Sequence, residues 1–206
     1  MKVFHFDPEV PEADLWQLEE VAGLVGREAL GVVPTDTFYA FACDVESQVA
    51  ARRLYDVKGL APKKPLSILC ADLSMAGPYV RGVPTTYYRA MRRVLPGPYT
   101  FVVPAGDALP RVMLRTRKTI GIRVPDDLVC RTLVERFGRP LLCTSVRVES
   151  DAVLTDPWEI GQRFERQIDL LVDGGVRPAE PSTVIDLTGP EPVLLREGKG
   201  PVDAFL

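Results

Sequence analysis

Histidine is almost absent from this sequence, since the chain of 206 residues contains only His5. A Ser-His-Asp triad, a Cys-His pair, an HExxH zinc site or a histidine-rich metal centre would each depend on that single imidazole. His5 lies near the N-terminus in the alternating run Val3–Phe6, a pattern typical of a strand. The sequence therefore argues against these classes of hydrolase and metalloenzyme.

Cysteine is sparse as well, and the four cysteines never come within metal-ligand spacing of one another. Each lies in an apolar stretch, where a free thiol behaves as a small buried hydrophobe in a reducing compartment. We therefore expect four packing thiols, with a disulfide framework as the disfavoured alternative. The four are Cys43, Cys70, Cys130 and Cys143.

Long apolar runs and a secretory leader are also missing. The longest uncharged apolar runs, Leu66–Ala71 and Tyr99–Ala105, are too short to cross a bilayer. Residues 1–11 mix acids with one lysine and contain no apolar core of a signal peptide. Apolar residues make up 46% and charged residues 26%, so that neither disorder nor a fibrous repeat fits. We expect a soluble, cytoplasmic protein with no membrane partner.

Charge is unevenly distributed along the chain, although the formal net charge is only −3. Between Leu73 and Pro125 the only acid is Asp107, which gives this segment +8 and leaves −11 for the rest. Clustered positive charge attracts and orients phosphates, so the segment favours an anionic partner. In the alternative interpretation, arginine stems cover helix faces and pair with acids of the flanking segments.

Helical patterns alternate with short apolar runs throughout the chain, and no composition break divides it. This pattern predicts one α/β domain over residues 1–206. Ser47 is suited to cap one helix, and Asp126 or Asp127 and Gly138 are suited to bound another. Helices are predicted near 15–25, 48–57, 86–95, 127–137 and 156–166, and strands near 31–33, 66–70, 99–103, 119–124, 141–144, 168–172, 183–187 and 193–196.

Small polar residues and bases gather at the ends of these predicted strands, where ligands of α/β sheets bind. Hydroxyls and cations without histidine suit phosphoryl or nucleotidyl transfer with Mg²⁺, although no P-loop is present. Taken singly, Thr35 could be a turn former, Lys58 a helix C-terminal charge and Ser182 a strand-start hydroxyl. The segments are Pro34–Thr37, Lys58, Lys63–Lys64, Arg123, Thr144–Ser145, Ser182–Thr183 and Arg196.

The order of these segments resembles the YrdC/YciO family of threonylcarbamoyl-AMP synthase-like proteins. Seven blocks in the family's order cover nearly the whole chain, from about residue 10 to residue 205. Each block is weakly specific alone, and together they are specific. They are Gly31–Tyr39, 58–66, Leu95–Thr100, Thr119–Pro125, Leu142–Ser145, Ser182–Asp186 and Leu195–Gly198.

The resemblance implies a twisted mixed sheet with flanking helices, the α/β fold of the double-stranded-RNA-binding type, with a positively charged concave surface. It implies an activity that joins L-threonine, bicarbonate and ATP, with Mg²⁺, into threonylcarbamoyl-AMP for tRNA modification, without a structural metal. By resemblance, threonine is bound by Thr35, Arg123 and Ser182, and the nucleotide by Lys58, Lys64, Ser145 and Arg196. The basic middle third would lie on the concave surface and bind RNA through Arg89, Arg92, Arg93, Arg115, Arg117 and Lys118.

The sequence departs from the synthase pattern at two cation or amide positions. The second position of the family's Lys-x-Arg pair is Leu60, and the third position of Ser-x-Asn is Arg147. Losing a charge-assisted hydrogen bond costs about 1.5–3 kcal/mol, or roughly ten- to a hundredfold in binding or rate. These departures resemble the YciO branch, and they predict reduced synthase efficiency.

Three functions remain open at this stage. The first is threonylcarbamoyl-AMP synthesis from ATP, L-threonine and bicarbonate. The second is binding of double-stranded or structured RNA with vestigial catalysis, which the basic segment and the lost partners favour. The third is non-catalytic sensing of adenine nucleotides. The synthase hypothesis requires Thr35, Arg123, Ser182 and Arg196 to line one cavity beside Lys58.

Overall fold

The predicted helix boundaries have local chemical causes that the structure makes visible. The computed structural model describes residues 1–7, 14–59, 66–109, 118–147 and 153–205. The Ser47 hydroxyl accepts the backbone N–H of Ala50 at 3.1 Å, and the Asp127 carboxylate accepts that of Cys130 at 2.8 Å. Gly138 ends the second of these helices with φ of 80°. The predicted caps Ser47, Asp127 and Gly138 are therefore confirmed.

The helices follow the periodicity of the sequence, with small shifts at their ends. The two short 3₁₀ helices, η2 and η3, were not predicted, and η2 falls between a strand and the helix α3. The α-helices are α1 (Leu15–Val25), α2 (Gln48–Lys58), α3 (Thr85–Val94), α5 (Leu128–Phe137) and α6 (Pro157–Phe164), and the 3₁₀ helices are η2 (Ser74–Tyr79) and η3 (Val202–Ala204).

Ten described strands form one mixed sheet in the order β1-β8-β2-β3-β7-β4-β6-β5-β9-β10. Neighbours along the chain are often far apart in the sheet, and parallel and antiparallel pairs alternate irregularly. The strands are β1 (Lys2–His5), β2 (Gly31–Val33), β3 (Ala40–Asp44), β4 (Ser67–Leu69), β5 (Tyr99–Pro104), β6 (Thr119–Arg123), β7 (Leu141–Ser145), β8 (Leu170–Asp173), β9 (Thr183–Asp186) and β10 (Val193–Arg196).

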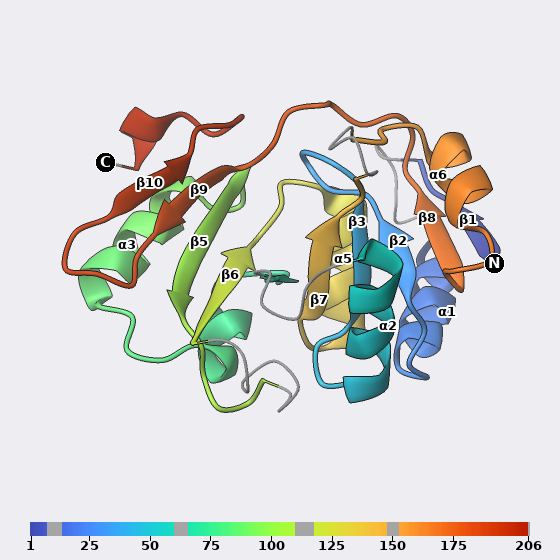
Figure 1. Cartoon of the computed structure of the whole chain (residues 1–206), viewed down its shortest axis with the longest axis horizontal. Helices are drawn as coiled ribbons and strands as arrows, with labels where there is room; N and C mark the ends of the chain where they lie inside the picture. Colours follow the sequence, from blue (N-terminus) through green and yellow to red (C-terminus); the bar gives the residue numbers. More distant parts are fainter. Residues whose placement is uncertain (8–13, 60–65, 110–117, 148–152, 206) are drawn as a thin grey trace.

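Helices cover both faces of the sheet around its β2, β3 and β7 strands (Figure 1). On one face, Phe41 of β3 packs with Leu54 of α2 and Phe164 of α6 in one core cluster. On the other face, Ala42 of β3 packs with Leu133 of α5 and with α1 in a second cluster. The expected α/β fold, a twisted sheet with flanking helices, is thereby confirmed.

At the β5 and β9 end, only one face of the sheet carries a helix (Figure 1). Phe101 and Val103 of β5 are buried in the same core cluster as Met91 of α3. Thr100 and Val102 alternate with them and point to the other face, because successive side chains of a strand alternate. This second face is therefore left open for a cavity.

A long connection, residues 174–182, runs from β8 across the top of the molecule to β9, at the other end of the sheet (Figure 1). The buried Tyr39 hydroxyl holds its beginning, donating to the Gly175 carbonyl at 2.7 Å and accepting from the Gly174 N–H at 3.1 Å. Burial raises the pKa of Tyr39 well above its usual range, so this hydroxyl keeps its proton. None of the helices in the described part has the length and apolarity that a bilayer span needs.

Candidate functional site

The open face of the sheet forms a cavity of about 1060 Å³. Small and polar residues make its floor, among them Ser67 of β4, Thr100 of β5 and Gly121 of β6. A Cβ on Gly121 would lie only 2.3 Å from the Ser67 Oγ atom, so the glycine keeps the floor low. The volume of the cavity is at the upper end of the range for small-molecule pockets, which measure ~300–1,000 Å³.

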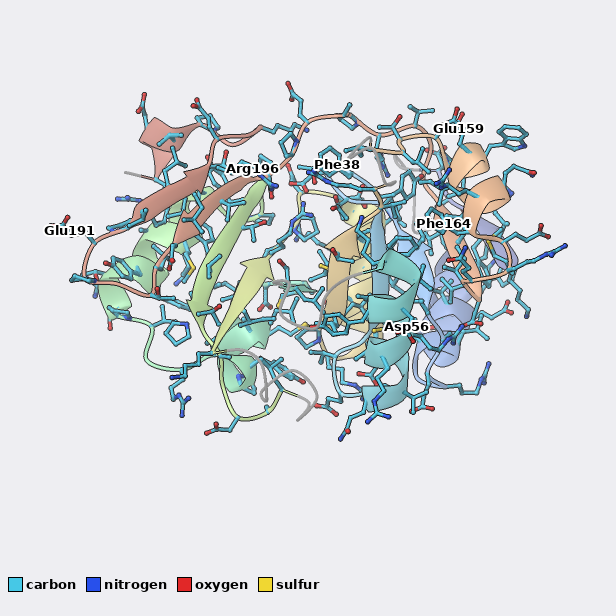
Figure 2. All side chains as sticks on the ribbon, viewed as in Figure 1. Phe38, Asp56, Glu159, Phe164, Glu191 and Arg196 are labelled. Atoms are coloured by element: carbon cyan, nitrogen blue, oxygen red, sulfur yellow. The ribbon has the colours of Figure 1, made fainter. Side chains whose placement is uncertain are left out.

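Positive charge dominates the described walls of this cavity. Five basic side chains line it, and Asp56 is the only acid among its described lining residues. The lining residues come from both sides of the cavity: Arg196 lies on β10, whereas Asp56 and Phe164 lie across the cavity on α2 and α6 (Figure 2). The cavity therefore suits an anion. Its bases are Lys58, Arg123, Arg147, Arg163 and Arg196.

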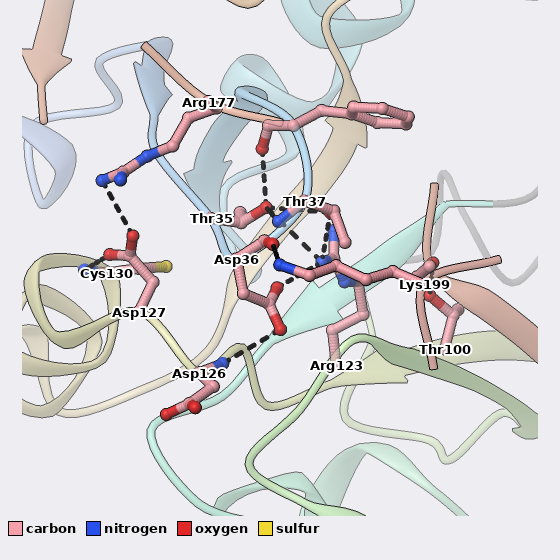
Figure 3. A network of polar contacts seen from close by, with 12 residues as sticks. Thr35, Asp36, Thr37, Thr100, Arg123, Asp126, Asp127, Cys130, Arg177 and Lys199 are labelled. Atoms are coloured by element: carbon pink, nitrogen blue, oxygen red, sulfur yellow. Dashed lines mark hydrogen bonds and ion pairs between the residues drawn. The ribbon is translucent and has the colours of Figure 1, made fainter. Parts of the chain in front are cut away.

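One guanidinium in the cavity wall is already neutralised by the protein. The Arg123 Nη2 atom donates to Asp36 Oδ1 at 2.9 Å and to Thr37 Oγ1 at 2.8 Å (Figure 3). The side chains of Arg123 and Asp36 are 10% and 4% exposed, so this ion pair is desolvated. Asp36 Oδ2 accepts the Asp126 N–H at 3.1 Å, and Lys199 Nζ donates to the Asp36 carbonyl at 2.8 Å. Arg123 is thus rigidly positioned.

Arg196, on the opposite wall, is also fixed, by the segment that precedes β9. Its Nε and Nη2 atoms donate to the Ser182 carbonyl at 3.1 and 2.9 Å, and the Ser182 hydroxyl lies 2.8 Å from the Thr100 hydroxyl. Partial burial and the nearby charges of Arg147 and Arg123 lower the pKa of Arg196. The guanidinium groups repel one another, and an anion placed among them would relieve that repulsion.

A third guanidinium, that of Arg147, follows the end of β7. The central carbon of this guanidinium, Cζ, lies 5.5 Å from the centre of the Phe38 ring, which makes a cation–π contact. Its backbone carbonyl accepts from Lys58 Nζ at 3.1 Å. Lys58 is in the last turn of α2, and Ser145 ends β7. The ends of α2 and β7 thus bring Lys58, Ser145 and Arg147 to one wall.

Five of the side chains predicted to bind threonine or nucleotide line this one cavity, and one predicted side chain does not. Thr35 is fully buried, and its hydroxyl donates to the Phe38 carbonyl at 2.6 Å, because the chain turns after Pro34. Thr37, which is equally buried, lines the cavity, whereas Thr35 does not, contrary to the expectation that placed Thr35 in it. Lys64 lies outside the described residues. The five are Lys58, Arg123, Ser145, Ser182 and Arg196.

Sequence reasoning assigned no role to Thr37 and Thr100, which line the cavity, or to Asp36, which holds Arg123 in place. Thr37 and Asp36 belong to the same motif as Thr35, and composition gives no sign of which of these side chains faces the ligand. Thr100 had a usable signal, because it stands between the apolar Tyr99 and Phe101 in a strand pattern.

Of the described bases in the basic middle third, Arg123 alone lines the cavity, whereas the resemblance implied that this segment lies on a concave surface. Arg89, Arg92 and Arg93 lie on α3, which packs on the face of β5 opposite to the cavity. Lys118 precedes β6 and does not line the cavity. Arg115 and Arg117 lie outside the described residues.

The cysteines offer no nucleophile to this site. All four are free and buried. Cys143 lines the cavity, but desolvation by burial raises its pKa to about 12. Its thiol therefore stays protonated near neutral pH, and the reactive species of a cysteine is the thiolate.

The chain resembles proteins from several organisms over its full length. The family model Sua5/YciO/YrdC, described as telomere recombination, matches residues 24–198. YciO of Escherichia coli K12, an uncharacterized protein, is 37% identical over 205 residues, 98% of each chain. The crystal structure of E. coli YciO matches with a TM-score of 0.91 and 36% identity, over 100% of both chains.

Longer relatives match as well. A threonylcarbamoyl-AMP synthase of Pyrococcus abyssi is 30% identical over 189 residues, which are 91% of this chain and 56% of the synthase. The structure of P. abyssi Sua5 complexed with L-threonine matches with a TM-score of 0.90 and 27% identity, over 98% of this chain and 59% of that one. The chain spans somewhat more than half the length of these two proteins.

Proposed function

This chain belongs to the Sua5/YciO/YrdC family, and we propose that its cavity binds ATP and L-threonine and forms threonylcarbamoyl-AMP. One observation carries the proposal: side chains from α2, β6, β7 and β10 and from the segment before β9, matched to the family by sequence, line the same cavity. A threonylcarbamoyl-AMP synthase and a Sua5 protein complexed with L-threonine are among the relatives, which supports both ligands.

Threonine is assigned to the wall formed by Arg123, Ser182 and Thr37. The Arg123 Nη2 atom is used by Asp36 and Thr37, whereas its buried Nε has no partner among the described residues. A carboxylate beside this guanidinium would supply the missing acceptor. The paired hydroxyls of Thr100 and Ser182 lie within the same cavity and offer polar contacts for the amino acid.

The nucleotide is assigned to Lys58, Ser145 and Arg196, with Mg²⁺ arriving as part of the MgATP substrate. In the reaction, the threonine amine joins bicarbonate as a carbamate with loss of water. A carbamate oxygen then attacks the α-phosphorus, and the bond to the β-phosphate breaks, releasing pyrophosphate. The protein's part is to hold anions in line and to stabilise the charge that develops, which fixed guanidinium groups do well.

A pyrophosphate-release assay tests this function. We expect ATP, Mg²⁺, bicarbonate and threonine to yield pyrophosphate at a rate that depends on threonine. Arg196→Gln should lower that rate by about ten- to a hundredfold, since it removes a charge-assisted contact. Arg52→Gln, an exposed change on α2 outside the cavity lining, is the matched control. Folded protein that releases no threonine-dependent pyrophosphate would contradict the proposal.

A second candidate function, RNA binding, is favoured by the surface of α3. This helix carries three arginines and no acid, in the sequence TTYYRAMRRV. Arg89, Arg92 and Arg93 are exposed, their spacing places them on one helix face, and no ion pair joins them to another described residue. We propose that RNA phosphates bind this face, on the side of the sheet opposite the cavity.

Salt dependence distinguishes this surface from a merely solvated helix. With tRNA or double-stranded RNA, the triple change of Arg89, Arg92 and Arg93 to glutamine should reduce the salt slope of log affinity by about 2–3, because each lost phosphate contact removes about 0.7–0.9. The matched control changes three exposed arginines elsewhere, Arg27, Arg52 and Arg166. An unchanged slope in the α3 variant, or no RNA binding by the native protein, would reject the RNA surface.

A further inference from the structure

Two arginines approach the cavity from opposite walls. Arg147 follows β7, near the middle of the sheet, whereas Arg196 ends β10 at one edge. Four strands, β4, β6, β5 and β9, lie between them in the sheet order and supply the floor. Both side chains line the cavity, so the space between them is ligand space.

Each of the two side chains is held in place before any ligand arrives. The Phe38 ring supports the Arg147 guanidinium at 5.5 Å, and Lys58 Nζ holds the Arg147 carbonyl at 3.1 Å. The Nε and Nη2 atoms of Arg196 donate hydrogen bonds to the Ser182 carbonyl, so Nη1 can donate to a ligand. A positioned donor binds with little loss of side-chain entropy, and this favours a preformed anion site.

Neither guanidinium is neutralised by an acid of the described chain. The ion pairs of the described residues do not include Arg147 or Arg196, and Asp36 is committed to Arg123. Partial burial lowers the pKa of Arg196, and the charges of Arg147 and Arg123 lower it further. Two like charges facing one cavity destabilise the empty site, and an anion bound between them would reverse that cost.

We propose that Arg147 and Arg196 form a two-sided clamp on an inorganic or nucleoside polyphosphate, and that Arg147 determines its selectivity for the longer phosphate chain. The clamp deepens the proposed function, on which it rests for the assignment of ATP. The Arg147 guanidinium presents a planar fork of donors with a full positive charge, which matches the oxygens of a phosphate. Two separated guanidinium groups can contact different phosphates of a chain at the same time, which a single phosphate does not allow.

Calorimetry with inorganic triphosphate, orthophosphate and adenosine tests the clamp without threonine or bicarbonate. Native protein should bind triphosphate at least about tenfold more tightly than orthophosphate. Arg147→Asn and Arg196→Gln should each weaken triphosphate binding by about ten- to a hundredfold and leave adenosine binding unchanged. Because both residues hold one ligand, the double variant should lose less than the product of the single losses.

Controls separate the clamp from general charge and from folding. Arg147→Lys keeps the charge without the planar fork and should fall between the native protein and Arg147→Asn. Arg52→Gln should bind triphosphate like the native protein, and thermal denaturation should confirm that each variant is folded. Native-like triphosphate binding by Arg147→Asn, or strictly multiplicative losses, would overturn the clamp. The variants could weaken triphosphate binding as expected while the native protein releases no threonine-dependent pyrophosphate. That result would refute the synthase function and leave the clamp standing.

Discussion

Arg123→Met is expected to lower the free energy of unfolding by about 3–5 kcal/mol, because it leaves the Asp36 carboxylate buried without its counter-charge. The Asp36 side chain is 4% exposed, and Arg123 Nη2 lies 2.9 Å from its Oδ1 atom. The same change removes a hydrogen bond to Thr37 from the cavity wall. Urea denaturation at neutral pH measures the loss, and calorimetry with threonine measures the effect on the site.

A double variant identifies the cause of this loss. Adding Asp36→Asn to Arg123→Met removes the stranded charge while keeping an oxygen that can accept the Asp126 N–H. The double variant should therefore be more stable than Arg123→Met alone, with a coupling of about 1–3 kcal/mol. A cost below 1 kcal/mol for Arg123→Met would mean that water reaches Asp36 and that the wall is not rigid.

Phe41→Ala is expected to cost about 3–5 kcal/mol of unfolding free energy, the range for a large buried ring replaced by alanine. Phe41 is fully buried in β3, and its ring meets the Phe164 ring edge-on with centroids 4.9 Å apart. Phe164 belongs to α6 and lines the cavity. The packing void left by the missing Phe41 ring should therefore also loosen α6 and weaken ligand binding in the cavity.

Chemical denaturation of Phe41→Ala beside Val49→Ala tests this packing. Val49 lies on α2, which covers the same face of the sheet, but its side chain is exposed. Its truncation should change the unfolding free energy by no more than about 0.5 kcal/mol. Equal effects of the two substitutions would contradict the view that the Phe41–Phe164 contact anchors α6.

Local structure was predictable from the sequence wherever a short-range cause exists. Ser47 and Asp127 cap their helices because their side chains accept backbone N–H groups. Gly138 ends its helix because glycine readily adopts a left-handed backbone conformation. By contrast, β3 was not predicted, because all the residues of Ala40–Asp44 are buried and the run has no alternation. The predicted helix near 156–166 is shorter, ending at Phe164.

The candidate site was predictable in its residue types and only partly in its geometry. Arg123, Ser182 and Arg196 come together because β6, β5, β9 and β10 follow one another in the sheet order, and no local pattern encodes that order. The burial of Thr35 depends on a turn with a bond to the Phe38 carbonyl. The basic charge of α3 faces away from the cavity because Met91 fixes the inner side of that helix.

The long connection over the top of the molecule, residues 174–182, divides the binding groups between two portions of the polypeptide. Everything up to β8 supplies Lys58, Arg123 and Arg147, whereas Ser182 and Arg196 are translated only afterwards. On the ribosome, a nascent chain that has released β8 therefore holds four of the five bases that line the cavity and lacks Arg196 on the facing wall. Ligand capture therefore becomes available only after β10 has been translated, and cleavage of this connection would break the covalent link between the two sets of binding residues.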